Sequence, residues 1–153
     1  MCKEEVILSR IGPLRIKSNQ KQILKLTLTD KALNEVATLT PLALEVSRQL
    51  DAYFAGEIRA FSLPFRLEGT PFQLKVWAAL QTIPYGQTVT YGEIAKLIDL
   101  PKSYRAVGMA CKKNPILIII PCHRVLGKNN QLVGYAAGLK VKEILLDLEK
   151  TYS

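Results

Sequence analysis

Short apolar stretches separated by turn residues run through the first third of the chain. They cover residues 6–8, 14–16 and 23–28, and the last of them alternates apolar and polar positions as a half-buried strand does. A segment with apolar residues at helical spacing follows, which begins at Pro41 and is closed by Gly56 as a C-terminal cap. The pattern predicts a small sheet followed by a helix, an αβ scaffold without a histidine for catalysis.

The helical spacing disappears between residues 57 and 69, where proline and glycine interrupt the chain. We place a domain boundary in this segment. The prediction is an N-terminal αβ domain over residues 1–60, a linker over residues 61–69 and a C-terminal domain over residues 70–153. At 153 residues, the chain is long enough for one well-cored domain with a small companion.

Capping signals divide the C-terminal part into helices. Thr70 and Thr90 each stand three residues before a Gln or Glu, which is the spacing of a capping box, and each opens a helix. The second of these helices is short and ends at a turn over residues 99–102, after which Ser103 caps a helix over residues 104–112. Two short helices joined by a tight turn are typical of a helix-turn-helix, although many helical hairpins with this layout do not touch DNA.

A run of apolar residues, 116–120, leads into Pro121, Cys122 and His123. The run predicts a buried strand that ends by presenting a thiol beside the only imidazole of the chain. A thiolate next to a base is the usual arrangement of a nucleophilic cysteine. A buried cysteine that only fills the core fits the same pattern, and adjacency in sequence does not decide between the two.

Basic residues are concentrated in the half of the chain that holds this thiol. Residues 1–69 carry ten Lys or Arg against eight Asp or Glu, whereas residues 70–153 carry eleven against five, and the net charge is +8. A basic surface favours a polyanionic partner, nucleic acid above all, because Lys and Arg neutralise phosphates. Charge alone also fits a basic protein without such a partner.

The numbers of cysteines and histidines narrow the chemistry. Three cysteines, an odd number, argue against a disulfide framework and for a reducing compartment. One histidine and widely separated cysteines give no zinc spacing, so we expect no metal site. No apolar run is long enough to span a membrane and no signal-peptide layout is present, which predicts a cytoplasmic protein.

The predicted helix over residues 104–112 carries one long basic side chain among small ones. Arg105 is followed by Ala106, Gly108 and Ala110, which are too small to read base edges but allow a close approach. The arrangement suits a minor groove or a gap between stacked bases, with Arg105 as the probe. Tight packing of one helix on another uses the same small residues.

The last predicted helix, residues 139–151, separates its acidic residues around the helix axis. With residues placed at intervals of about 100°, Glu149 falls about 80° from Val141, on the flank of the apolar stripe. A half-buried carboxylate needs a partner, and Arg124 and His123 are the best candidates in the chain.

A series of short motifs in the C-terminal part is more specific than any single one. The series consists of Gly69-Thr-Pro-Phe-Gln73, Val76-Trp77, Ile83-Pro-Tyr-Gly86, Thr90-Tyr91, Arg105-Ala-Val-Gly108, Asn114-Pro115 and Pro121-Cys-His-Arg-Val125. In order and spacing, over about residues 57–150, these motifs resemble those of the O6-alkylguanine-DNA alkyltransferases, also called methylated-DNA–protein-cysteine methyltransferases.

The resemblance implies a small ribonuclease H-like αβ domain followed by a C-terminal domain with a winged helix-turn-helix that binds the minor groove of DNA. It also implies direct-reversal repair, in which a damaged guanine is flipped out of duplex DNA and its O6-alkyl group moves to a cysteine. No cofactor is implied, and we expect a monomer. Because the thioether product is stable and no residue is suited to hydrolyse it, we expect each molecule to act once.

The resemblance assigns roles to residues at matching positions. Cys122 corresponds to the alkyl acceptor, His123 to the base that acts through a water, and Glu149 to the acid that orients His123. Asn114 corresponds to the residue that supports the turn around the cysteine, and Tyr91 to the proton donor near guanine N3. The residues expected to line the substrate pocket are Tyr91, Val125, Tyr135, Ala136 and Cys111. The residues expected to contact DNA are Ser103, Tyr104, Arg105, Ala106, Gly108 and Lys112. Among these, Arg105 corresponds to the finger that fills the space left by the flipped base.

The chain departs from the family pattern at Ala136, where some relatives carry serine, and in its shorter loop over residues 133–138. Both departures bear on the acceptance of large adducts such as benzyl. The chain also lacks the residues with which some relatives bind zinc in the N-terminal domain. Two other functions fit parts of the sequence. Alkyltransferase-like proteins flag lesions without a cysteine, which Cys122 argues against, and a Cys-His hydrolase of another substrate leaves Arg105 unexplained.

Overall fold

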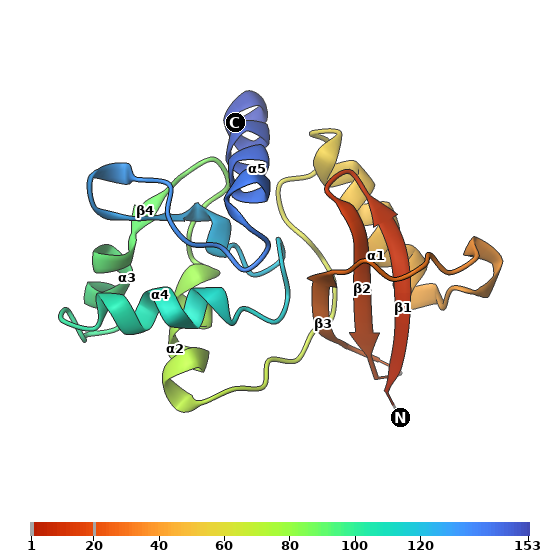
Figure 1. Ribbon diagram of the computed structural model, residues 1–153, viewed down its shortest axis with the longest axis horizontal. Helices are drawn as coiled ribbons and strands as arrows, with labels where there is room; N and C mark the ends of the chain where they lie inside the picture. Colours follow the sequence, from red (N-terminus) through yellow and green to blue (C-terminus); the bar gives the residue numbers. More distant parts are fainter. Residues whose placement is uncertain (1, 20) are drawn as a thin grey trace. The chain divides into compact units, whose positions relative to one another are not determined.

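The computed structural model describes residues 2–19 and 21–153, which divide into two compact units (Figure 1). The first unit ends at Leu67, and the second runs from Glu68 to Ser153. Each unit buries apolar residues of its own. No helix in the described part of the chain is long and apolar enough to cross a membrane.

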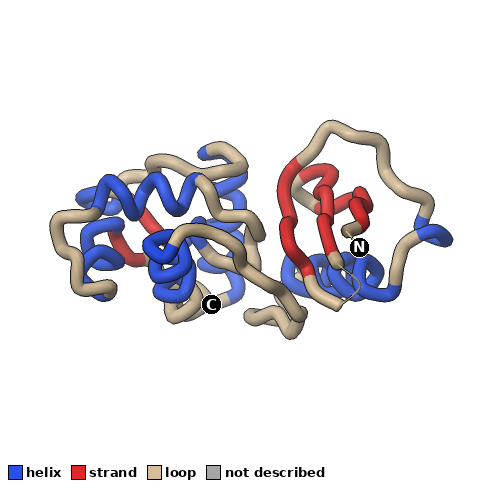
Figure 2. The backbone as a smooth tube through the Cα atoms, turned by 90° about the horizontal axis from the view of Figure 1, so that it is seen from below, coloured by secondary structure: helices blue, strands red, loops and turns tan. Residues whose placement is uncertain are grey.

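The first unit combines an antiparallel sheet with one helix, as the sequence pattern predicts. The strands β1 (Lys3–Ser9), β2 (Gly12–Ser18) and β3 (Ile23–Leu28) lie in that order. A short 3-10 helix, η1 (Val36–Thr38), precedes α1 (Pro41–Phe54), which packs against β1. Figure 2 shows this helix along one side of the strands.

The segment after α1 belongs to the first unit. The chain leaves the helix through Gly56, whose φ of 78° suits a residue without a side chain. Residues 61–67, assigned to a linker from the sequence pattern, then run beside β3. Ile23 N donates to Pro64 O at 2.9 Å, and the backbone N–H of Arg66 donates to Ile23 O at 3.0 Å. These backbone hydrogen bonds place residues 64–66 beside the start of β3, at the edge of the sheet.

The second unit is mainly helical and contains one pair of very short strands. Its α-helices are α2 (Pro71–Leu80), α3 (Tyr91–Leu97), α4 (Tyr104–Lys112) and α5 (Leu139–Tyr152). Its 3-10 helices are η2 (Cys122–Arg124) and η3 (Lys128–Asn130). The strands β4 (Val89–Thr90) and β5 (Val125–Leu126) pair in parallel. With the turn between them, α3 and α4 form the helical hairpin expected from the sequence.

Capping boxes fix the starts of α2 and α3, and both were predicted from the sequence. At α2, Thr70 Oγ1 accepts from Gln73 N at 3.1 Å, and Gln73 Oε1 accepts from Thr70 N at 3.0 Å. At α3, Thr90 and Glu93 make the same reciprocal pair at 3.1 Å each. Each pair satisfies two N–H groups that lack a partner within the helix. The start of α3 therefore places Tyr91 in its first turn.

Ser103 does not cap α4 with its side chain, contrary to the prediction. It stands at the N-cap position, but its Oγ donates to Leu100 O at 2.6 Å. Its backbone, with φ −91° and ψ 17°, lacks the extended conformation of a capping residue. Near its C-terminal end, α4 is bound by Trp77 of α2, whose indole Nε1 donates to the buried Ala110 O at 2.9 Å.

The apolar run 116–120 is not the predicted strand. It forms successive turns, in which Ile120 N donates to Ile116 O at 3.1 Å and Cys122 N donates to Ile120 O at 2.8 Å. Ile118 has a φ of 71°, a conformation that β-branched residues rarely adopt. The run is buried almost throughout. Its apolar residues therefore indicate burial, and burial alone does not distinguish a strand from buried turns.

The face that α5 turns inward differs from the apolar stripe predicted for it. The sequence pattern predicts an inward stripe of Val141, Ile144, Leu145, Leu148 and Tyr152. Of these only Leu145 is fully buried, and Lys142 and Glu149 are buried beside it, whereas Ile144 and Tyr152 are 39% and 40% exposed. The buried residues are spaced i, i+3 and i+7, which places them on one side of the helix. The orientation of α5 is set by polar partners inside the unit as much as by apolar burial.

Replacing the capping residue of α3 provides a test of this local architecture. We expect Thr90→Ala to lower the free energy of unfolding by about 1 kcal/mol, because Glu93 N loses its acceptor. Urea denaturation followed by circular dichroism measures the change. Thr90→Ser keeps the hydroxyl and is expected to remain close to the parent protein. Equal losses in the two variants would contradict the capping role.

Candidate active site

Cys122 is buried at the start of η2, and the side chain of Asn114 holds it there. The thiol is 1% exposed, and Asn114 Nδ2 donates to Cys122 Sγ at 3.0 Å. The same amide group donates to Ile120 O at 2.8 Å, while Asn114 Oδ1 accepts from Ile116 N at 3.0 Å. One buried amide thus fixes both ends of the turns before the cysteine and the direction of the sulfur.

A buried network of charged side chains surrounds His123. His123 Nε2 lies 2.6 Å from Glu149 Oε2, and Arg124 donates to the same carboxylate through Nε at 2.8 Å and Nη2 at 3.0 Å. Arg124 also donates to Ile83 O at 2.8 Å, and Gly86 N donates to Glu149 Oε1 at 3.3 Å. The partners predicted for Glu149 from the helical wheel are therefore both confirmed.

These contacts determine which nitrogen of His123 carries the proton. The Glu149 carboxylate already accepts from Arg124, so it acts toward His123 as a hydrogen-bond acceptor. His123 Nε2 is then the protonated nitrogen. His123 Nδ1 is buried and has no hydrogen-bond partner among the residues that the structure describes. Burial lowers the pKa of His123 more than Glu149 raises it, so the imidazole is neutral near pH 7 and Nδ1 is available to accept a proton.

The thiol of Cys122 is protonated in the resting protein. Burial raises its pKa to about 11, against the hydrogen bond from Asn114 and the positive charge of Lys142, which lower it. A buried thiol of this kind needs a base before it can act as a nucleophile. The neighbouring neutral imidazole, oriented by a carboxylate, is suited to that task.

Lys142 of α5 is a site residue that the sequence reasoning missed. Its side chain is buried, and its Nζ donates to Val133 O and to Gly134 O, each at 2.9 Å. The same Nζ lies 3.5 Å from Tyr91 Oη. Burial lowers the pKa of Lys142. The signal was present in the spacing, because Lys142 lies seven residues before Glu149 and so on the same face of α5.

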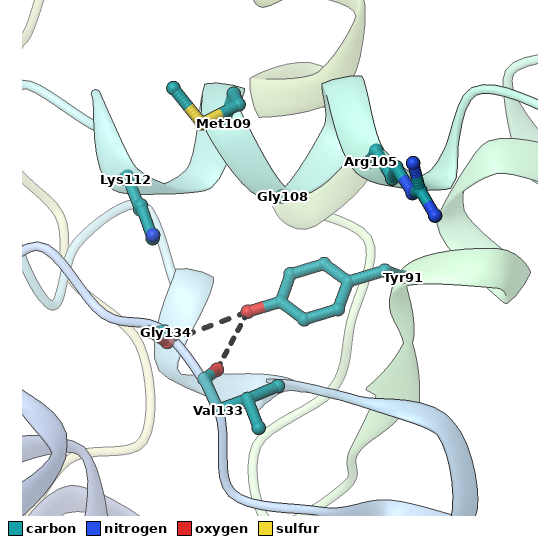
Figure 3. A pocket seen from close by; sticks show the side chains of 7 residues that line it. All are labelled: Tyr91, Arg105, Gly108, Met109, Lys112, Val133 and Gly134. Atoms are coloured by element: carbon teal, nitrogen blue, oxygen red, sulfur yellow. Dashed lines mark hydrogen bonds between the residues drawn. The ribbon is translucent and has the colours of Figure 1, made fainter.

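Tyr91 points its hydroxyl at the same two carbonyl groups. Its Oη donates to Val133 O at 2.9 Å, with Gly134 O at 3.4 Å (Figure 3). Burial, with smaller contributions from Cys111 and Cys122, raises the pKa of Tyr91, so the phenol stays protonated at neutral pH. The phenol of Tyr91 is therefore a hydrogen-bond donor at neutral pH.

A cavity of about 300 Å³ opens beside Tyr91, between α4 and the segment that follows η3 (Figure 3). The residues that line it are Tyr91, Arg105, Gly108, Met109, Lys112, Val133 and Gly134. Of the pocket residues expected from the sequence, only Tyr91 is among them. Val125, Tyr135 and Cys111 are buried, and Ala136 is exposed. The ring of Tyr135 meets the imidazole of His123 edge to face, with 6.5 Å between ring centres.

Most of the residues expected to contact DNA are exposed, at the start of α4 and along it. Tyr104, Arg105, Ala106 and Lys112 are exposed, and Gly108 and Ser103 are half-buried. The guanidinium of Arg105 lies 5.9 Å from the centre of the Tyr104 ring. Within the described residues, no group of three or more side chains is suited to bind a metal ion.

The buried imidazole makes folding stability depend on pH. The folded state holds the pKa of His123 below the usual value of 6.5, whereas the unfolded chain takes up a proton near that pH. As the pH falls from 7 to 5.5, we expect the free energy of unfolding to decrease, by at most about 1.4 kcal/mol per pH unit. Urea titrations at several pH values measure this slope. Because His123 is the only histidine, the slope in this window should vanish in His123→Gln, and its persistence would contradict the assignment.

Lys142 offers a second test of the site's construction. We expect Lys142→Met to lower the free energy of unfolding by about 1–3 kcal/mol, because the carbonyl groups of Val133 and Gly134 lose a charged donor. Lys140→Met, at an exposed position of the same helix, is the matched control and should change stability little. Equal effects of the two substitutions in urea denaturation would show that the buried contacts of Lys142 are unimportant.

Two protein-family models together match nearly the whole chain. Residues 2–67 match the 6-O-methylguanine DNA methyltransferase ribonuclease-like domain, and residues 71–151 match the DNA-binding domain of the same family. A methylated-DNA–protein-cysteine methyltransferase of Methanosarcina acetivorans is 62% identical over 105 residues, which are 69% of this chain and 67% of the relative. The enzyme of that name from Methanosarcina barkeri is 48% identical over 95% of this chain and 96% of its own.

Solved structures agree with these relatives. The crystal structure of Mycobacterium tuberculosis OGT in complex with DNA superposes with a TM-score of 0.88 at 43% identity, covering 98% of this chain and 94% of that one. The matches confirm the predicted order of a ribonuclease-like αβ domain and a helical DNA-binding domain, a mixed α+β fold. The chain belongs to the 6-O-methylguanine DNA methyltransferase family.

Proposed function

We propose that this protein repairs O6-alkylguanine in duplex DNA by moving the alkyl group irreversibly to Cys122. The observation that carries the proposal is the set of contacts around the thiol. Asn114 Nδ2 donates a hydrogen bond to Cys122 Sγ at 3.0 Å and orients the sulfur. Glu149 holds the adjacent imidazole at Nε2, and the Nδ1 atom of that ring is available to accept a proton. The relatives named as methylated-DNA–protein-cysteine methyltransferases support the same reaction.

The first step activates the thiol. His123 Nδ1 takes the proton of Cys122 through one bridging water, and the positive charge that forms on the imidazole is stabilised by Glu149 at 2.6 Å. Arg124 holds the carboxylate in place from the other side. The positive charge of Lys142 favours the thiolate, since it lowers the pKa of Cys122.

The second step transfers the alkyl group. The Cys122 thiolate attacks the alkyl carbon, a carbon–sulfur bond forms, and the bond from that carbon to O6 breaks with its electrons passing to the guanine ring. Tyr91 donates its phenolic proton to guanine N3, and the phenolate is reprotonated when the imidazolium gives up its proton. Overall, one proton moves from the thiol to guanine, and the products are a thioether and guanine, whose N3 proton shifts to N1 to give the normal tautomer. An in-line thiolate and a positioned donor are what a poor electrophile requires.

DNA reaches the site along α4 in this proposal. The helix faces the minor groove, where Arg105 fills the space left by a guanine that is flipped into the protein. The other proposed DNA contacts are Ser103, Tyr104, Ala106, Gly108 and Lys112. The proposed walls of the base pocket are Val125, Tyr135, Ala136 and Cys111. Exposure of Tyr104, Arg105 and Lys112 supports the DNA contacts, and proximity of Tyr135 to His123 supports the pocket.

We further propose that each protein molecule acts once, and that the protein works as a monomer in the cytoplasm. The thioether formed on Cys122 is a stable product, which supports one transfer per protein molecule. All of the proposed catalytic residues, Cys122, His123, Glu149, Asn114 and Tyr91, lie within the second unit, so a single chain carries the complete site.

A mass measurement tests the transfer. After incubation with a duplex that contains O6-methylguanine, we expect the peptide with Cys122 to gain the mass of one methyl group, in a ratio of one methyl per protein molecule. Cys122→Ser should gain none. Retention of the gain in that variant would assign the methyl to another residue. Conversion of more lesions than protein molecules would contradict the single-use mechanism.

The role of Tyr91 as proton donor predicts a separable kinetic defect. We expect Tyr91→Phe to slow methyl transfer at saturating DNA by about 100-fold, because positioned acids contribute rate enhancements of that order. Its dissociation constant for undamaged duplex should stay within about twofold, since phosphate contacts supply most of that affinity. Tyr152→Phe on the outer part of α5 is the control. An unchanged transfer rate in Tyr91→Phe would remove the residue from the mechanism.

A further inference from the structure

α4 carries one long apolar side chain in an exposed basic stripe. Arg105, Met109 and Lys112 are spaced i, i+4 and i+7, so they share one face of the helix. Met109 is 55% exposed, while Val107 and Cys111 are buried on the opposite side of α4. Met109 is therefore not part of the core of the second unit.

The stripe faces the cavity beside Tyr91. Arg105, Met109 and Lys112 all line this cavity, and Val133, which is 40% exposed, lines it from the segment after η3 (Figure 3). The cavity thus combines apolar side chains, the ring and hydroxyl of Tyr91, and two cations. This combination suits a nucleotide, whose base and sugar offer apolar surface and whose phosphate is an anion.

We infer that Met109 is a specificity-determining residue that packs against the damaged nucleotide as it leaves the base stack. The inference rests on the proposed function, and it adds a contact that the catalytic residues do not supply. Proteins that open the minor groove use apolar side chains, methionine among them, as wedges at unstacked bases. The unbranched thioether of methionine adapts to an irregular surface at little cost.

The position of Met109 separates its role from that of Arg105. Both side chains line the cavity, with Met109 one helical turn further along α4. In the proposed mechanism Arg105 occupies the gap that the flipped base leaves in the duplex, whereas Met109 packs beside the nucleotide that has left it. Contact with base and sugar exists only when the nucleotide is displaced. Met109 therefore favours the flipped state over the stacked state and contributes little to binding of undamaged DNA, where phosphate contacts dominate.

Single-turnover kinetics with full-length variants test the inference. At saturating O6-methylguanine duplex, we expect Met109→Ala and Met109→Gln to slow methyl transfer about tenfold, as loss of two buried methylene-sized contacts does. Met109→Leu keeps the apolar volume and should stay within about twofold of the parent. The dissociation constant for undamaged duplex should stay within about twofold in all three variants. Leu74→Ala, at an exposed apolar position of α2 outside the cavity, is the matched control.

A second readout reports the displaced base directly. With 2-aminopurine beside the lesion, the parent protein should raise fluorescence on binding, and Met109→Ala should raise it less, whereas Leu74→Ala should match the parent. Equal transfer rates in Met109→Ala and Leu74→Ala would overturn the inference. So would a loss of affinity for undamaged duplex that accounts for the whole effect of Met109→Ala. Absence of methyl transfer in the parent protein would instead reject the proposed function, and the inference with it.

Discussion

The buried carboxylate of Glu149 is the contact on which the rest of the second unit depends. A carboxylate removed from water is costly unless its oxygens are paired, and here both are, by Arg124, His123 and the Gly86 N–H. Because two of these partners belong to η2, the carboxylate ties α5 to the turn that carries Cys122. The same pairing fixes the tautomer of His123. Folding and the proposed proton transfer therefore use one set of hydrogen bonds.

The parts of the fold that depend on local sequence could be predicted. The starts of α2 and α3 followed from reciprocal caps at Thr70 and Thr90, whose partners lie three residues away and need no tertiary information. The inward position of Glu149 followed from helical geometry together with the absence of other partners for a carboxylate. The motif series around Cys122 indicated the family, and the matches to both domains confirmed it.

The remaining features depend on side-chain contacts that form only in the folded chain. The apolar run 116–120 reads equally well as a strand or as buried turns, and the choice is made by the amide of Asn114, which only the folded chain brings to both ends of the run. Lys142 looks like an ordinary exposed lysine until Val133 and Gly134 are placed beside it. The cavity at Tyr91 is likewise formed by segments about 40 residues apart, so no local pattern indicates Met109.

The short parallel pairing of β4 with β5 has a consequence for how accurately the site is assembled. Val89 pairs with Val125 and Thr90 with Leu126, and these strands directly precede Tyr91 and directly follow η2. The backbone of Tyr91 directly follows this shared ladder of hydrogen bonds, and that of Cys122 lies three residues before it. The ladder therefore holds together the two backbone segments from which the phenol and the thiol extend.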